Sequence, residues 1–212
     1  MWKLRILAVS ALLLVVSATS CRRKAADDSS LGRQTYNERC ASCHGAEGLG
    51  SKALGAPAIA GLDSWYVGAQ LGKFRRGVRG SHPEDAEGAR MAAAARGLES
   101  NRESAAVAEH VAQLPPTPAP AVIEGDTSRG QRWWGRCAGC HGPGAGGNPV
   151  SRAPPLNGSD DWYLRKQLGK FRQGMRGTHP DDTSGAIMRS VALTLPDDQA
   201  MNDVVAYLAT LR

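Results

Sequence analysis

The chain has 212 residues, a formal net charge of +6, and only 5% aromatic residues among 42% hydrophobic ones. This length suits one or two domains, and domains of roughly 90 residues with so few large side chains would have thin cores unless a bound group filled them. Apart from Arg22-Arg23-Lys24 the cations are dispersed, so the basic balance does not indicate nucleic-acid binding.

The first 21 residues have the pattern of a bacterial export signal. Two cations precede the apolar run Ile6–Val16, which is too short to span a bilayer comfortably. Small residues then lead to Cys21, as in lipoprotein signals, although Ala18 stands where such signals usually carry leucine. We predict an exported protein on the periplasmic side, tethered to the membrane by lipid on Cys21, with 22–30 as a flexible tether. Cleavage with release and retention as an uncleaved anchor are the alternatives.

The rest of the chain is a duplication with an offset of 97 residues. Cys40–Met91 matches Cys137–Met188 without a gap, and 27 of 52 positions are identical. A period of this length is a whole domain, which argues for two copies of one domain rather than a solenoid. We predict domains at 31–114 and 126–212, joined by a stiff, extended, proline-rich linker at 115–125.

Both copies predict the same helices. A first helix leads into the first cysteine, and a second begins at an aspartate that can cap it and carries apolar residues at helical spacing. A third closes each copy, after a capping box in the first half. No run looks like a strand, so the predicted fold class is all-α. The expected positions are Leu31–Cys40 and Ser128–Cys137, then the segments starting near Asp63 and Asp160, and finally those after Ser100 and from Leu195.

Each copy also contains one CxxCH motif, the attachment signature of c-type haem. Two thiols separated by two residues can both add to the vinyl groups on one porphyrin edge, and the histidine then lies beneath the iron as its proximal ligand. A CxxC pair alone also occurs in redox dithiols and zinc sites, but here both pairs have the histidine and both follow an export signal. We predict two covalently bound haem c groups, on Cys40, Cys43, His44, Cys137, Cys140 and His141.

The haems change the charge balance. Loss of residues 1–20 removes two of the cations and lowers the side-chain charge from +6 to +4. Two haems also bring four propionate carboxylates. The mature protein is therefore closer to neutral than its sequence pI suggests.

The sixth iron ligand decides between electron transfer and substrate chemistry. Met91 and Met188 occupy equivalent positions in a chain with five methionines, which favours ligation over a role as core filler. Methionine and histidine together saturate the iron and raise its reduction potential. The matched His82 and His179, each before a proline, are the alternative ligands, and an open iron is the third possibility. We predict no catalytic residue, and the predicted iron ligands are His44 with Met91 and His141 with Met188.

Three further kinds of repeated residue have candidate roles at the haems. Arginines either pair with haem propionates or end a solvated helix, and tryptophans either donate an indole N–H to a propionate or pack the core. Prolines shape the loop whose carbonyl accepts the N–H of the proximal histidine. These residues are Arg75, Arg79, Arg172 and Arg176, Trp65 and Trp162, and Pro57 and Pro154.

With the two motifs, the matched methionines and the repeated WYxxxQLxKFRxGxRG stretch, the chain resembles the class I di-haem cytochromes c of the c-four type over about residues 31–212. The resemblance implies tandem cytochrome c domains, each a small helical fold wrapped around its haem, packed about a pseudo-twofold axis with facing haem edges. The chain departs from that family in Ser81–Gly88, its copy Thr178–Gly185, the proline-rich joint and the predicted lipid anchor.

The resemblance further implies an electron carrier whose partners are redox proteins, with a quinol-oxidising complex as donor and a terminal oxidase or reductase as acceptor. The alternative is a cytochrome subunit fixed in a larger membrane oxidoreductase complex. A di-haem peroxidase is a third reading. It requires one open haem beside acid–base residues, and the likeness of the two sites here argues against it.

Overall fold

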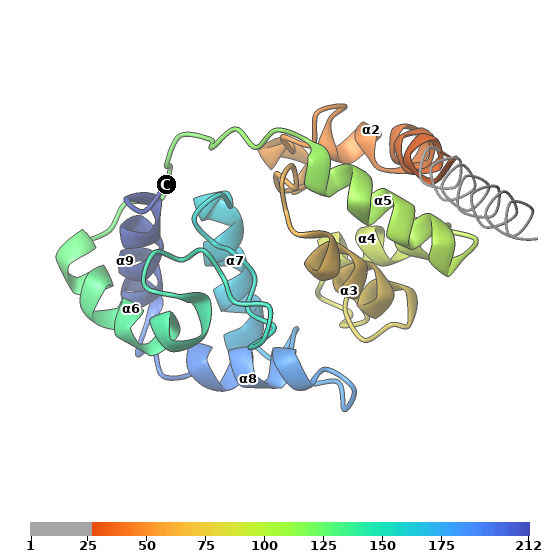
Figure 1. Cartoon of the computed structure of the whole chain (residues 1–212). Coiled ribbons are helices and arrows are strands. Elements are labelled where there is room, and N and C mark those ends of the chain that lie inside the picture. Colours follow the sequence, from red (N-terminus) through yellow and green to blue (C-terminus); the bar gives the residue numbers. More distant parts are fainter. Residues whose placement is uncertain (1–26) are drawn as a thin grey trace, which may run out of the picture.

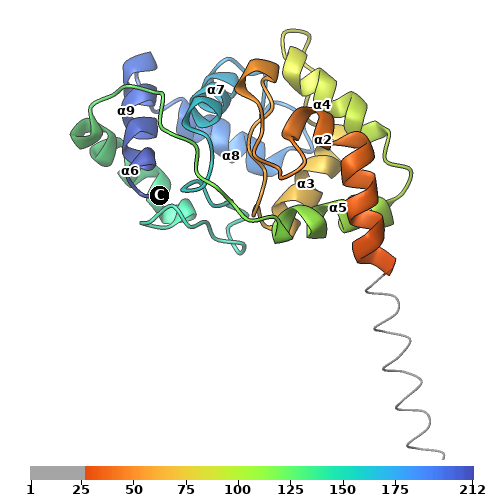
Figure 2. The same cartoon turned by 90° about the horizontal axis from the view of Figure 1, so that it is seen from above.

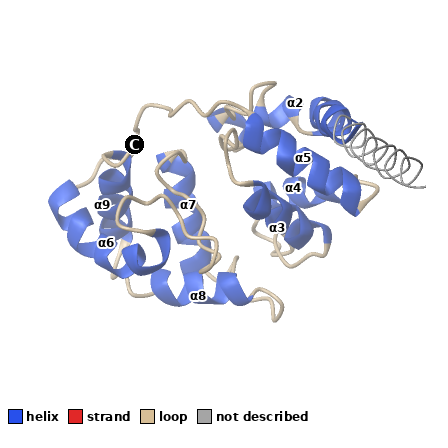
Figure 3. Cartoon of the chain, viewed as in Figure 1, coloured by secondary structure: helices blue, strands red, loops and turns tan. Residues whose placement is uncertain are grey.

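The computed structural model describes residues 27–212, so the predicted signal and Cys21 lie outside the described residues. Within that range the regular structure is helical (Figure 3). Two isolated bridges accompany the helices, Ser51–Ala56 and Asn148–Ala153. The all-α fold class is therefore confirmed. No helix of residues 27–212 is both long and apolar enough to cross a membrane.

The two halves have corresponding helices. The first half begins with a helix over 27–39, and a turn at Cys40 separates it from the helix that carries the histidine. The second half has one uninterrupted helix at this place. The elements of the first half are α2 (Ala41–His44), η1 (Lys52–Leu54), α3 (Ser64–Arg75), α4 (Ala86–Arg96) and α5 (Asn101–Gln113). Those of the second are α6 (Thr127–His141), α7 (Asp161–Arg172), α8 (Thr183–Ala192) and α9 (Asp198–Ala209).

The halves lie side by side, joined by an extended segment (Figure 1). In Figure 1 and in the perpendicular view of Figure 2, α7 and α8 lie between α9 and the first half. The helices with the repeated KFR stretch, α3 and α7, thus belong to the region where the halves approach each other.

Helices α4 and α8 were not expected from the sequence. The α4 sequence, AEGARMAAAAR, is rich in alanine and lacks the periodic large apolar residues that mark an amphipathic helix. Both helices have a side-chain cap: Gly88 N donates to Asp85 Oδ1 at 2.9 Å and Gly185 N donates to Asp182 Oδ1 at 3.0 Å. These two helices carry Met91 and Met188.

The predicted capping by Asp63 and Asp160 is only half right. Both residues stand at the N-cap positions of α3 and α7, but neither side chain caps its helix. The Asp63 carboxylate accepts the indole N–H of Trp65 at 3.0 Å, and Asp160 Oδ2 accepts the backbone N–H of Ala58 in the other half at 2.8 Å. The aspartates therefore fix a tryptophan and the interface between the halves.

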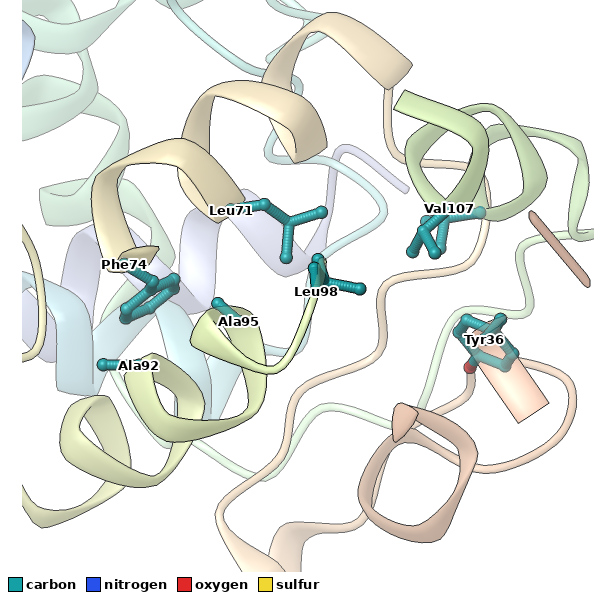
Figure 4. Packing of buried hydrophobic residues seen from close by; sticks show 8 residues of the cluster. Tyr36, Leu71, Phe74, Ala92, Ala95, Leu98 and Val107 are labelled. Carbon is teal, nitrogen blue, oxygen red and sulfur yellow. The ribbon is translucent and has the colours of Figure 1, made fainter. Parts of the chain in front are cut away.

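Each half has its own small core. In the first, Tyr36, Leu71, Phe74, Leu98 and Val107 come from four different segments (Figure 4), and alanines fill much of the remaining space. The second core has Trp134 and the inner face of α9. These cores surround the cavity described below.

The halves are joined by ion pairs that exchange under the 97-residue offset. Lys73 Nζ donates to Asp182 Oδ1 at 2.6 Å, and Lys170 Nζ donates to Asp85 Oδ1 at 2.5 Å. Each half thus gives its lysine to the aspartate of the other half, at equivalent positions. This exchange is the contact pattern of a twofold axis. The pseudo-twofold arrangement implied by the resemblance is present in this interface.

Candidate haem sites

A single cavity of about 760 Å³ extends across both halves and is lined mainly by apolar side chains. Small-molecule and cofactor sites in proteins have this apolar character, with a few polar groups at fixed positions. The cavity gathers all eight residues predicted to hold the haems: Cys40, Cys43, His44, Met91, Cys137, Cys140, His141 and Met188.

Both histidines of the CxxCH motifs are buried and held by a backbone carbonyl. His44 Nδ1 lies 2.9 Å from the carbonyl oxygen of Pro57, and His141 Nδ1 lies 2.9 Å from that of Pro154. Because a carbonyl only accepts, Nδ1 carries the proton and Nε2 keeps its lone pair for a metal. The predicted role of the two proline loops is confirmed.

The protonation of these histidines suits iron ligation. Burial lowers the pKa of His44 and of His141, and the hydrogen bond to the proline carbonyl opposes that effect only in part. Both rings are therefore neutral at physiological pH. Neutral imidazole is the form that binds a metal.

A glycine brings each proline loop close to its histidine. Gly50 N donates to the His44 carbonyl oxygen at 2.7 Å, and Gly50 has a φ of +78°. A Cβ at this position would lie 2.5 Å from the carbonyl carbon of Pro57. Gly147 repeats the arrangement beside His141, with its N–H 2.8 Å from the His141 carbonyl oxygen.

The two cysteines of each motif differ in exposure. Cys40 and Cys137 are partly buried, and burial raises the pKa of each thiol to about 11. Cys43 and Cys140 are exposed. All four thiols line the cavity, as attachment to a porphyrin edge requires.

The competing ligands, His82 and His179, do not line the cavity. Each accepts a backbone N–H within its own turn, from Glu84 at 3.2 Å and from Asp181 at 3.1 Å. These histidines therefore shape the turns that precede α4 and α8, and the methionines on those helices reach the cavity.

Arg79 and Arg176 also line the cavity. For these two residues the sequence left open whether they bind propionates or end a solvated helix. Arg79 donates to Gln70, to Tyr163 and to Gln167 at 2.8, 2.8 and 3.1 Å, and Arg176 donates to both glutamines at 2.8 and 3.2 Å. Among residues 27–212 neither has a carboxylate partner, and Arg176 Nε is buried without any hydrogen-bond partner. Burial and the nearby Arg79 lower the pKa of Arg176.

Arg79 is buried and Arg176 is partly buried, and neither forms an ion pair with a carboxylate among residues 27–212, so this part of the cavity suits a ligand with carboxylates. Haem has two propionates, and the residues present fit it. The alternative of solvated helix ends is wrong for Arg79 and Arg176. Arg75 and Arg172, the last residues of α3 and α7, instead bond to later segments of their own halves. Arg75 donates to Asn101 at 3.0 Å, and Arg172 donates to the Pro196 carbonyl at 3.2 Å.

The tryptophan prediction is resolved for Trp65, whose indole N–H donates to Asp63 rather than remaining available for a propionate. Sequence reasoning missed the roles of Gln70, Gln167 and Tyr163, which accept from the two arginines of the cavity. Their recurrence in both halves was a signal that these positions matter, but it does not say which residues they contact. Only the interface explains why they are repeated.

Similarity to known proteins supports the interpretation of these sites as haem sites. The family model described as Cytochrome c matches residues 29–115 and 127–212. A thiosulfate dehydrogenase electron acceptor from Stutzerimonas stutzeri is 33% identical, with 96% of this chain and 92% of that protein covered. A cytochrome c4 from Azotobacter vinelandii is 32% identical, with coverage of 89% and 91%.

Two solved structures are similar. The cytochrome c4 from Pseudomonas stutzeri superposes with a TM-score of 0.68 at 24% identity, over 85% of this chain and 96% of that one, and supports the fold. A thiosulfate dehydrogenase from Marichromatium purpuratum also gives a TM-score of 0.68, at 34% identity. It covers 86% of this chain, which spans 40% of that longer protein.

Proposed function

The chain belongs to the cytochrome c family, as an electron-transfer protein with two covalently bound haem c groups, and we propose that it carries electrons in the periplasm from an oxidoreductase to a terminal oxidase or reductase. The observation that supports this proposal is the pair of equivalent buried histidines, each held by a proline carbonyl, in one shared cavity. Two sites of the same construction suit relay of electrons rather than a division into donor and catalytic haems.

We assign the axial ligands as His44 with Met91 and His141 with Met188. All four side chains line the cavity, and the matched histidines outside the motifs do not. The bound iron supplies one-electron chemistry. With both ligands bound, the coordination sphere of the iron would be closed, which would exclude substrate from the metal and favour a high reduction potential.

The chain's own residues give this site its rigidity. The four cysteines would hold the two macrocycles by thioether bonds, and the Pro57 and Pro154 carbonyls hold each imidazole in one tautomer and one orientation. Arg79, which is buried, and Arg176, which is partly buried, would supply positive charge for the propionates. A site that is already ordered needs little rearrangement when an electron arrives.

For the donor, the relatives support a thiosulfate dehydrogenase. A protein named for accepting electrons from that enzyme is similar over 96% of this chain, and the thiosulfate dehydrogenase structure contains a region of the same fold. A quinol-oxidising complex is the alternative donor. We further propose attachment to the outer face of the membrane through lipid on Cys21, which keeps the carrier near membrane-bound acceptors.

A fixed subunit of a larger complex is the second candidate. The chain is 31% identical to the cbb3-type oxidase subunit FixP of a Bradyrhizobium strain, but it spans about half of that protein, 52% of its length. A permanent partner therefore has less support than a separate carrier. Purification from native membranes separates the two, since a carrier elutes as a lone small protein.

A redox titration followed by optical spectroscopy tests the ligand assignment. We expect two low-spin, six-coordinate haems, each with the weak red absorption band of methionine–iron ligation, and no binding of carbon monoxide to the reduced protein. A five-coordinate spectrum with ready carbon monoxide binding at both haems would refute electron transfer through closed sites.

Stopped-flow mixing tests the donor. The oxidised protein is mixed with a thiosulfate dehydrogenase and thiosulfate, and haem reduction is followed optically. We expect fast reduction that depends on both enzyme and thiosulfate. Reduction only by a quinol-oxidising complex would leave the carrier role intact and reassign its donor.

A further inference from the structure

Each methionine assigned as a ligand lies in the second turn of a short helix that begins at a buried aspartate. Asp85 is 3% exposed and Asp182 is 1% exposed, and each accepts the backbone N–H of the glycine three residues later. A helix of 10 or 11 residues is too short to be stable by itself, so its position depends on this first turn and on packing.

The charge on each of these aspartates is balanced from the opposite half. Lys73 of the first half donates to Asp182 Oδ1 and to Ser184 Oγ, both at 2.6 Å. Lys170 of the second half donates to Asp85 Oδ1 at 2.5 Å and to Glu87 Oε2 at 2.8 Å. Within residues 27–212 these lysines are the only cationic partners of the two aspartates.

We propose that Lys73 and Lys170 are positioning residues that act across the interface, Lys73 on the methionine of the second haem site and Lys170 on that of the first. The proposal rests on the His/Met ligation given above. A buried carboxylate that loses its partner is strongly unfavourable, and it responds by binding a proton or admitting water. Either response disturbs the first turn of the helix and moves the methionine sulfur relative to the iron.

The two arrangements differ in one respect. Glu87 in the first half corresponds to Ser184 in the second, and Glu87 also accepts from Lys166 at 2.7 Å. Among residues 27–212, the start of α4 therefore contacts two lysines, and the start of α8 contacts only Lys73. We expect the second haem to be the more sensitive to loss of its lysine.

The test uses the full-length, haem-loaded protein and changes Lys73 to leucine. To separate the haems, the change is made in the Met91→His and Met188→His backgrounds, each of which keeps one methionine–iron band. In the Met91→His background, Lys73→Leu should weaken the remaining band several-fold and lower the potential of that haem. In the Met188→His background the remaining band should stay unchanged.

Three further variants sharpen the result. Lys52→Leu removes an exposed lysine of the same half and should change neither band. Lys73→Arg keeps the charge and should preserve the band. Lys73→Leu combined with Asp182→Asn leaves no unpaired charge and keeps a capping oxygen, so it should recover the band even if Lys73→Leu alone folds poorly.

An equal effect of Lys73→Leu on both haems, or no effect on the Met188 site, would overturn the proposal. The proposal would also fail if the double variant Lys73→Leu with Asp182→Asn did not recover the methionine–iron band. Failure of the ligand assignment is visible separately: in that case neither methionine-to-histidine change removes half of the band, whatever residue occupies position 73.

Discussion

The orientation of each imidazole depends on backbone atoms that a sequence motif does not contain. The Pro57 carbonyl reaches His44 because the segment starting at Gly50 folds back against it, closed by the bridge between Ser51 and Ala56. Gly50 is needed twice, for its positive φ and for the absence of a Cβ. A residue outside the CxxCH motif thus controls the proximal ligand.

Replacing Gly50 with alanine should displace the Pro57 carbonyl, because the new Cβ would lie 2.5 Å from that residue's carbonyl carbon. We expect a lower yield of protein with both haems and a changed potential at the first haem only, measured by the haem-to-protein ratio and redox titration. Gly45→Ala is the matched control: its φ is +79°, but the nearest atom lies 3.9 Å from the added Cβ. Equal defects in both variants would mean that backbone strain alone is responsible.

The two arginines of the cavity should raise the haem potentials. Reduction adds one electron to a haem, and a nearby cation stabilises the reduced state. Arg176→Gln should therefore lower a reduction potential by on the order of tens of millivolts, seen by redox titration. Arg172→Gln removes a cation that instead bonds the Pro196 carbonyl, and it should have a smaller effect. A rise in potential in Arg176→Gln would contradict this role.

At this scale the sequence predicted much of the site. The CxxCH spacing and the matched methionines identified the residues that line the cavity, and the recurrence of Pro57 and Pro154 indicated the carbonyl bond. The partners of Arg79 could not be predicted, because Tyr163 and Gln167 are 84 and 88 residues away in the chain. No local pattern encodes such contacts.

The first and last helices of each half cross at a glycine. Gly130 on α6 faces the Asp203 carbonyl on α9, and Gly32 faces the Ala106 carbonyl in the same way. Neither glycine has room for a Cβ. This close crossing fixes the angle of the helix that ends in the CxxCH motif, and so it connects core packing to the haem site.

Changing Gly130 to alanine should force α6 away from α9 and destabilise the second half by about 1–3 kcal/mol. Gly135→Ala, on the same helix with no atom within 4 Å of the new Cβ, should instead stabilise it by roughly 0.5–1 kcal/mol, because alanine has the higher helix propensity. Urea unfolding followed by circular dichroism measures both. If both substitutions changed the free energy of unfolding in the same direction, the crossing of α6 and α9 would be less tightly packed than the structure indicates.

The helices that the sequence predicted are those with strong local signals. The Ser100 cap of α5 is present, with Glu103 N donating to Ser100 Oγ at 3.0 Å. Helix α4 was missed because its alanines give no apolar period, whereas α8 was missed although Ile187, Met188 and Val191 lie at helical spacing. Both helices are also held by tertiary contacts, the Lys73 and Lys170 pairs. A helix stabilised by another domain cannot be recognised from its own sequence.

The two domains of residues 27–212 are held together by reciprocal ion pairs, and these pairs depart from symmetry at one position. Glu87 accepts from Lys166 and Lys170, whereas its counterpart Ser184, within the described part of the chain, accepts only from Lys73. The duplication predicted two like domains, but it did not predict their relative placement. The interface residues are repeated for contact with the other copy, and a repeat does not reveal what its members touch.

Acid should weaken the contact between the domains. Hydrogen bonds from Lys166 and then Lys170 lower the pKa of Glu87 from 4.5 to about 2. A carboxyl group with a lowered folded-state pKa contributes stability that is complete above pH 4.5 and is lost as the pH falls toward 2. Because the side chain is 31% exposed, we expect a contribution of about 1 kcal/mol, with most of it lost between pH 6 and pH 3.

The measurement is the urea midpoint of the haem-loaded protein at pH 6 and at pH 3, compared with Glu87→Gln. Other carboxylates, Asp203 among them, also titrate in this range. The quantity to compare is therefore the difference in urea midpoint between the two proteins at each pH, and not the change in midpoint of either protein alone. Glu87→Gln should be less stable than the parent protein at pH 6, and the gap should narrow at pH 3. Ser184→Ala, at the equivalent position, has no carboxyl group to titrate and should show a gap that is independent of pH. A constant gap for Glu87→Gln would mean that its ion pairs with the second domain do not form in solution.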